Sequence, residues 1–212
     1  MSGGTNTFAN YIGVGRSGGN GVVNMTGGEL NKTGNGHLIL GTPYQNLFGH
    51  DCSGVLNHSG GTINLQSGEF WCPEGRSDLG AISGTYNLSG TAVMNVNNWF
   101  AIGRSGASGT LNMTGGAINK SGGGQPAIII ADGGGAVGQV TQSAGTITSS
   151  SEFWIGQNGG TATYNLSGTG AINVNNYFCV GRGGNGANGT LAITGGSITQ
   201  AINGVFIVGD NS

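Results

Sequence analysis

The chain is poor in charge. Only 7% of its 212 residues are charged and the formal net charge is −2, so no basic surface is present to neutralise phosphates. We therefore expect no nucleic-acid partner. No apolar run approaches the roughly 20 residues of a membrane span, so we expect no membrane insertion. The opening "MSGGTNTF" has neither the basic nor the apolar region of a signal peptide.

Cysteine is also scarce. The three cysteines, Cys52, Cys72 and Cys179, form no C-x-x-C pair, which argues against a disulfide framework and a zinc site. Cys52 and Cys72 flank one turn of the array and can pair in an oxidising compartment, but unpaired thiols are the preferred interpretation. No Walker loop, G-x-S-x-G or H-E-x-x-H motif is present, and we expect no cofactor.

Glycine, in contrast, is abundant: the 48 glycines are about three times the usual share. They recur in a "G-R" phrase or its equivalent, mostly 25 to 28 residues apart, with a longer interval from Gly41 to Gly75. The anchors are Gly15, Gly41, Gly75, Gly103, Gly156, Gly181 and Gly209, with Ala131 filling the gap. Such a period is typical of solenoids.

A longer period overlies the short one. The segment "TYNLSGTAVMNVNNWFAIGR" (85–104) returns as "TYNLSGTGAINVNNYFCVGR" (163–182), three turns later. Likewise "EFWCPEGR" (69–76) resembles "EFWIGQ" (152–157). The array therefore consists of coils A, B and C in a three-coil super-repeat, in the order A-B-C-A-B-C-A from residue 22 onward.

Within each turn, apolar and polar residues alternate with period two, which indicates strands. In "TLNMT", Leu111 and Met113 share one face, and a Gly-Gly pair then bends the chain. We predict an all-β fold: one parallel β-helix (β-solenoid) of about seven coils over residues 1–212. We expect it to be uncapped at both ends, with a longer loop at 42–53, and the crossover rule favours a right-handed winding.

Four columns of inward-facing residues form the predicted core. The first is Val23, Leu56, Tyr86, Leu111, Val140, Tyr164 and Leu191; the second Met25, His58, Leu88, Met113, Gln142, Leu166 and Ile193; the third Leu30, Ile63, Met94, Ile118, Ile147, Ile172 and Ile198. The fourth pairs Leu38/Leu40, Phe100/Ile102, Ile128/Ile130, Phe153/Ile155, Phe178/Val180 and Phe206/Val208. Because His58 and Gln142 are polar, we expect a local bulge to re-aim them.

One outward column is apolar where a polar one is expected. It comprises Ile39, Trp71, Ala101, Ile129, Trp154, Cys179 and Ile207, with Tyr11, Trp99 and Tyr177 beside it. An exposed apolar patch usually marks an interaction site. The predicted binding or assembly surface is Tyr11, Ile39, Trp71, Trp99, Ile129, Trp154, Tyr177 and Ile207. Its expected binding partners are sugar rings or a second solenoid. The alternative is that the 42–53 loop or a further segment of the protein folds over it.

Arginines follow the anchor glycine at one edge of the array: Arg16, Arg76, Arg104 and Arg182. They are candidates for an anion or glycan contact, although solubilising turn residues are the preferred interpretation.

The outward T-x-N-x-T columns, such as Thr110 to Thr114, predict stacked Asn and Thr ladders. Ice binding by this flat face is a weaker alternative.

Polysaccharide-active enzymes share this architecture, and hydrolysis of a glycosidic bond needs a pair of carboxylates. The densest acidic group is Asp51, Glu69, Glu74 and Asp78, together with His50 and Arg76. A solvated pair of loops is the preferred interpretation, and we expect no enzymatic activity.

The phrase "FAIGRSGASGTLNMTGGAIN" resembles the short glycine-rich repeat of autotransporter passengers and PEP-CTERM-type exported bacterial proteins. The resemblance covers nearly the whole chain and implies a secreted or cell-surface β-helix, commonly a stalk or adhesin segment, without catalytic residues. The chain departs from that family in lacking a signal peptide, a translocator barrel and a sorting tail. We expect a non-enzymatic structural or adhesive solenoid that self-associates into filaments or forms part of a surface stalk, with a carbohydrate-binding module as the alternative.

Overall fold

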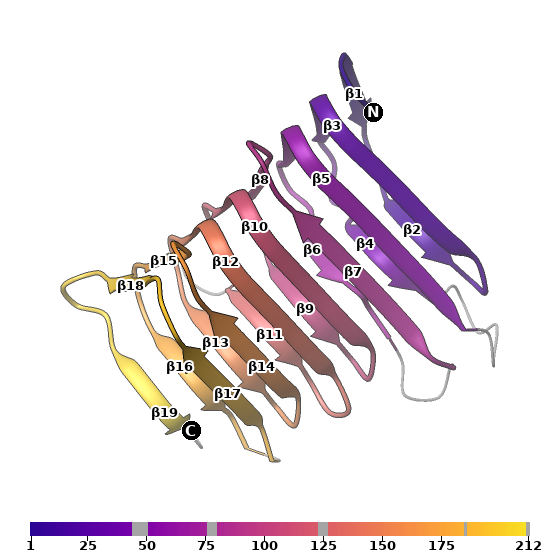
Figure 1. Ribbon diagram of the computed structural model, residues 1–212. Helices are drawn as coiled ribbons and strands as arrows, with labels where there is room; N and C mark the ends of the chain where they lie inside the picture. The colour runs from indigo at the N-terminus through magenta and orange to yellow at the C-terminus, as the bar shows by residue number, and fades with distance from the viewer. Residues whose placement is uncertain (44–50, 76–79, 123–126, 185, 211–212) are drawn as a thin grey trace.

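The chain forms a parallel β-solenoid, seen in a computed structural model that describes residues 1–43, 51–75, 80–122, 127–184 and 186–210. The described residues form strands and no helix. Successive turns stack so that every strand lies beside its equivalent in the next turn, and all strand pairs are parallel (Figure 1). The predicted parallel β-helix of about seven turns is confirmed. The hand of the winding stays a prediction, and residues 44–50 of the expected loop lie outside the described residues.

Two sheets make up the solenoid. Sheet one has 11 strands: β1 (Thr5–Phe8), β3 (Asn20–Lys32), β5 (Cys52–Leu65), β7 (Ile82–Leu88), β8 (Val93–Val96), β10 (Ser108–Lys120), β12 (Val137–Ser149), β14 (Thr161–Leu166), β15 (Ala171–Val174), β17 (Asn188–Ile193) and β18 (Ser197–Gln200). Sheet two has 8 strands: β2 (Ile12–Arg16), β4 (Leu38–Thr42), β6 (Phe70–Cys72), β9 (Phe100–Arg104), β11 (Ile128–Asp132), β13 (Phe153–Gln157), β16 (Phe178–Arg182) and β19 (Phe206–Asp210).

The strand register reproduces the predicted core columns. Leu111 pairs with Tyr86 on one side and with Val140 on the other. In the third column, Ile118 likewise lies between Met94 and Ile147. The columns converge in one apolar cluster between the sheets. Aromatic rings stack there from coil to coil, as Phe70 and Phe100 do with 4.8 Å between centroids.

Glycine is required where the chain leaves sheet two. Gly103 has a φ of 77°, a conformation that other residues adopt only under strain. A Cβ atom on Gly103 would stand 2.2 Å from the carbonyl oxygen of Val137 in the next coil. The anchor glycine of the repeat therefore permits both the bend and the close stacking of coils.

The predicted outward turn of His58 and Gln142 is wrong. Both side chains point into the core and are 1% and 0% exposed. The register of β10 and β12 does shift, but only after Met113 and Gln142, so the bulge leaves this column inside. A tyrosine of the following coil satisfies each polar group: His58 Nδ1 lies 3.0 Å from the Tyr86 hydroxyl, and Gln142 Oε1 accepts the Tyr164 hydroxyl at 2.5 Å.

Asparagine ladders run along the outer face of sheet one, as predicted. In the first ladder Asn57 donates to Asn24 at 2.7 Å, Asn87 to Asn57 at 2.7 Å and Asn112 to Asn87 at 2.8 Å. A second ladder, which the sequence analysis missed, links Asn31, Asn64, Asn95 and Asn119. Amide groups thus join consecutive turns along the solenoid axis.

The three cysteines are free and buried, as preferred from the sequence. Cys72 lies in the main core, whereas Cys52 lies in a small separate cluster with Ile82 and Ala107. Burial raises the pKa of the Cys179 thiol to about 11, because the thiolate would lose its hydration. All three thiols therefore serve as small packing groups.

Candidate functional site

The outer face of sheet two carries the apolar column predicted from the sequence, here called the flank. The flank consists of Ile39, Trp71, Ala101, Ile129, Trp154, Cys179 and Ile207. The strand register places these residues in one row: Trp71 pairs with Ile39 and Ala101, and Trp154 with Ile129 and Cys179. The row packs as two clusters that are separate from the main core.

The predicted exposure of the flank is wrong. Ile39 and Trp154 are 2% exposed, Trp71 is 8% exposed, and Ile129 is fully buried. Among the predicted surface residues, Tyr11 and Tyr177 are 36% and 38% exposed, and Trp99 and Ile207 are half-buried. The flank is buried because polar and aromatic side chains of neighbouring strands lie over it.

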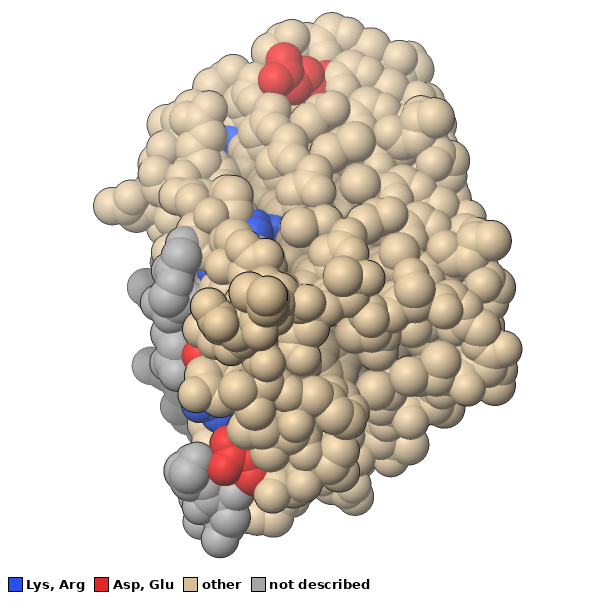
Figure 2. All heavy atoms as spheres, turned by 90° about the vertical axis from the view of Figure 1, so that its left-hand side faces the viewer, with Lys and Arg blue, Asp and Glu red and all other residues tan. Residues whose placement is uncertain are grey.

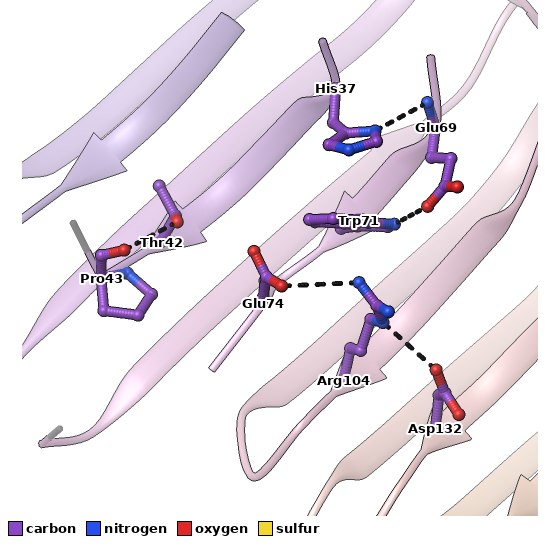
Figure 3. A network of polar contacts seen from close by, with 8 residues as sticks. All are labelled: His37, Thr42, Pro43, Glu69, Trp71, Glu74, Arg104 and Asp132. Carbon is purple, nitrogen blue, oxygen red and sulfur yellow. Dashed lines mark hydrogen bonds and ion pairs between the residues drawn. The ribbon is translucent and has the colours of Figure 1, made fainter. Parts of the chain in front are cut away.

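Trp71 shows how this cover is built (Figure 3). The His37 ring stacks on the indole with 4.0 Å between centroids, and the Arg104 guanidinium carbon lies 4.2 Å from the indole centroid. Figure 3 shows these two groups on opposite sides of the indole. The indole Nε1–H donates to Glu69 Oε2 at 2.7 Å. Both faces of Trp71 are therefore occupied, and only its edge is available to a ligand.

The Glu, the Trp and the Arg of this arrangement recur in the second B coil, where Ala127 stands in place of His37. Trp154 Nε1–H donates to Glu152 Oε2 at 2.7 Å, and the Arg182 guanidinium lies 4.3 Å from the indole centroid. Each clamp consists of a Glu and a Trp two residues apart in coil B and an Arg from coil C. We call these two sets the Glu–Trp–Arg clamps.

Two of the arginines predicted as anion or glycan contacts, Arg104 and Arg182, pair with carboxylates of the chain itself. Arg104 lies 3.4 Å from Glu74 and 3.2 Å from Asp132. Arg182 pairs with Glu152 and lies 3.7 Å from Asp210. Arg16 lies over the Tyr11 ring at 5.5 Å, and Thr42 is its strand partner. Arg76 lies outside the described residues. Figure 2 shows one face on which charged atoms are confined to small patches.

The acidic group considered for catalysis is dispersed into structural contacts. Asp51 Oδ1 accepts the Ala81 N–H at 2.7 Å, Glu69 accepts the Trp71 indole, and Glu74 pairs with Arg104. Burial raises the pKa of the Glu74 carboxyl, while Arg104 opposes that shift. His50 and Asp78 lie outside the described residues. Within the described ranges, no three His, Cys, Asp or Glu side chains gather into a metal site.

A groove opens beside the first clamp, across β2, β4 and β6. Its volume is about 430 Å³. Its lining residues are Tyr11, Arg16, His37, Ile39, Thr42, Trp71 and Glu74. It is the place where predicted surface residues, Tyr11, Ile39 and Trp71, meet a predicted arginine. The sequence analysis missed His37 and Thr42, which lie at the two ends of one short strand.

His37 is neutral in the groove at neutral pH. Burial lowers its imidazole pKa, and Arg104 and Lys32 lower it further against the opposing effect of Glu69. Because Nδ1 accepts the Glu69 backbone N–H at 3.2 Å, the ring proton resides on Nε2. The imidazole therefore has one donor, Nε2–H, left for another partner.

Two lysines are buried, which the sequence analysis did not predict. Lys32 and Lys120 occupy equivalent places in two A coils and are 0% and 1% exposed. Their ammonium groups donate to the backbone oxygens of Gly34 and Gly122. Burial lowers the pKa of both lysines. Each lysine thus donates to the carbonyl oxygen of the residue two positions after it.

These features define a parallel β-solenoid repeat protein whose coils are joined by side-chain ladders and clamps. Comparison with protein-family models, with curated proteins and with solved structures finds no match. None of the described segments forms a helix long and apolar enough to cross a membrane.

Proposed function

We propose that the chain is a non-enzymatic structural and adhesive β-solenoid of the bacterial cell surface or extracellular space, and that it self-associates end to end. One observation carries the proposal: polar side chains of the described residues bond mainly to their equivalents in the next coil, along the solenoid axis. Asn87 donates to Asn57, Asn95 donates to Asn64, and Arg182 pairs with Glu152 of the preceding coil.

The turn made by β17, β18 and β19 is where self-association is tested, because its core side chains Val208 and Ile193 are 69% and 55% exposed. β19 is the outermost strand of sheet two, and β17 is the outermost strand on its side of sheet one. Such an edge offers N–H and C=O groups to a further strand. Residues 188–210 contain a single charged residue, Asp210, so stacking of copies meets little charge repulsion.

The side-chain ladders support a structural role. The asparagine ladders and the Glu–Trp–Arg clamps all join one coil to the next. Polar side chains that would recognise a substrate in an enzyme here bind their own neighbours along the axis. A rod built in this way resists bending and local opening, as a stalk or filament requires.

The test is negative-stain electron microscopy with sedimentation velocity across a concentration series. We expect the wild-type chain to form lengthening rods, and Val208→Lys to remain a short monomeric rod because a charge replaces an exposed core contact. Val22→Lys is the matched control, since Val22 is 62% exposed on the side of sheet one. Short isolated rods of wild-type protein at every concentration would refute self-association.

A further inference from the structure

We infer that the groove between Tyr11 and the first clamp is a binding site for a neutral saccharide, one hexose ring of a longer glycan. This goes beyond the structural role, because it assigns a ligand to one place in the array. The groove volume of about 430 Å³ lies within the roughly 300–1,000 Å³ of small-molecule sites. It opens on the flank, away from the last turn that carries self-association.

The lining has the composition that a sugar ring needs. The Tyr11 ring, which is 36% exposed, and the edge of Trp71 give an apolar surface for the C–H face of a pyranose, and Ile39 lies buried beneath them. Around it, the Arg16 guanidinium and the His37 Nε2–H can donate hydrogen bonds, and the Glu74 carboxylate can accept them. One cationic and one anionic side chain line the groove. A neutral sugar, whose hydroxyl groups both donate and accept hydrogen bonds, therefore fits the groove better than a charged sugar does.

The walls are held in place before any ligand binds. The Tyr11 ring lies directly over Gly13, where a Cβ atom would stand 2.7 Å from Tyr11 Cε1. Thr42, which also lines the groove, donates its hydroxyl to the Pro43 carbonyl oxygen at 3.3 Å. On the other wall, His37 is fixed by Trp71 and by the Glu69 N–H. A preformed site loses little entropy on binding, which favours affinity for a small ligand.

The equivalent position in the next three-coil repeat, across β9, β11 and β13, shows which residues fill this space. Ala127, Asp132 and Gln157 stand there at the positions of His37, Thr42 and Glu74. Trp99, the counterpart of Tyr11, packs on the cluster of Ala127, Ile129 and Trp154 and fills the space. The open groove therefore coincides with four differences from the second repeat: His37 for Ala127, Thr42 for Asp132, Glu74 for Gln157 and Gly13 for Ala101.

The test is saturation-transfer difference NMR with titration calorimetry, using maltohexaose, cellohexaose and chitohexaose as probes and hexagalacturonate as the charged comparison. We expect at least one neutral hexasaccharide to bind. Tyr11→Ala should weaken that binding by tenfold or more, whereas Tyr177→Ala should leave it unchanged. Tyr177 is the matched control because it occupies the equivalent position in a later coil and is similarly exposed.

A graft of the second repeat gives an independent variant. The triple change His37→Ala, Thr42→Asp and Glu74→Gln should also abolish binding, with thermal melting reported to show that the fold persists. No binding of any neutral probe to the wild-type chain, or equal binding by Tyr11→Ala, would overturn the inference, as would preference for hexagalacturonate. Val208→Lys should still bind the saccharide, so failure of self-association and failure of this site are distinguishable.

Discussion

The buried pair of Gln142 and Tyr164 gives the sharpest test of how the core is specified. Gln142 is fully buried, its Oε1 accepts the Tyr164 hydroxyl at 2.5 Å, and its Nε2 donates to the backbone oxygens of Gly145 and Ala171 at 3.0 and 3.1 Å. Tyr164→Phe removes only the hydroxyl and leaves Gln142 Oε1 without its donor. A buried polar group left unsatisfied costs about 1–3 kcal/mol, so we expect the free energy of unfolding to fall by that amount.

Gln142→Met makes the complementary change. Methionine is the residue at this column position in two A coils, as Met25 and Met113. Alone, it leaves the Tyr164 hydroxyl buried without an acceptor, and we expect a similar loss of about 1–3 kcal/mol. The double variant removes the hydroxyl and its acceptor together but still lacks the two Nε2–H bonds to Gly145 and Ala171, so its loss should be smaller than the sum of the two single losses.

The assay is urea unfolding followed by circular dichroism, combined as a double-mutant cycle. With a chain of this length, each kcal/mol corresponds to a shift in Tm of roughly 2–4 °C, so thermal melting gives a second readout. Tyr177→Phe, on a half-exposed tyrosine, controls for loss of a hydroxyl as such. If the two single losses simply add in the double variant, the pair is not coupled and the reasoning fails.

Two further predictions concern protonation and the ladders. Burial lowers the pKa of His58 and His37 below the usual 6.5, so the unfolded chain binds protons first as the pH falls, and stability should decrease from about pH 7.5 to about pH 5.5. In His58→Gln, which places there the glutamine found at position 142 of the second B coil, Tm should depend less steeply on pH over that range. An unchanged dependence of Tm on pH would contradict the role of His58. Asn87→Ala should cost about 1–2 kcal/mol in urea unfolding because Asn87 bonds both Asn57 and Asn112, whereas Asn165→Ala, between Thr141 and Ala192, should cost less. Equal losses would argue against the ladder.

The columns of the core were predictable because two periods act together. Alternation within a strand decides which residues face inward, and the repeat length decides which residues stack. Leu111 therefore had to meet Tyr86 and Val140 once the segments were aligned. The asparagine ladders follow from the same register, since equivalent asparagines in adjacent coils lie within hydrogen-bond distance.

The burial of the flank was not predictable in this way. The alternation of apolar and polar residues correctly predicted that Trp71 faces away from the main core. It does not predict which side chains cover an outward-facing residue. His37, from just before β4, and Arg104, from the next coil, cover both indole faces. The available signal was the shared "E-x-W" of residues 69–71 and 152–154, followed one coil later by arginine.

His58 and Gln142 were misplaced because each polar residue was judged alone. The information lay in pairs: tyrosine enters the first column only in the C coils, and a polar residue enters the second column only in the B coils before them. A hydroxyl and a polar acceptor in adjacent coils satisfy each other inside an otherwise apolar core. Hydrophobicity read one residue at a time does not contain that relation.

Polar contacts inside the core and clamp contacts outside it coincide at the step from coil B to coil C. That step holds His58 against Tyr86 and Gln142 against Tyr164 inside the core. On the outer side of the same step, Arg104 covers Trp71 and Arg182 covers Trp154. A uniform solenoid can slip by one coil at little cost, because each column would meet similar residues after the slip. Matched polar pairs on both sides of one step in three make such a slip costly, since it would bury an unpaired polar group and detach an arginine from its carboxylate. The three-coil period thus places both buried polar pairs at the same kind of step, and the ion pairs of Arg104 with Asp132 and of Arg182 with Asp210 extend the specific contacts to the following A coil.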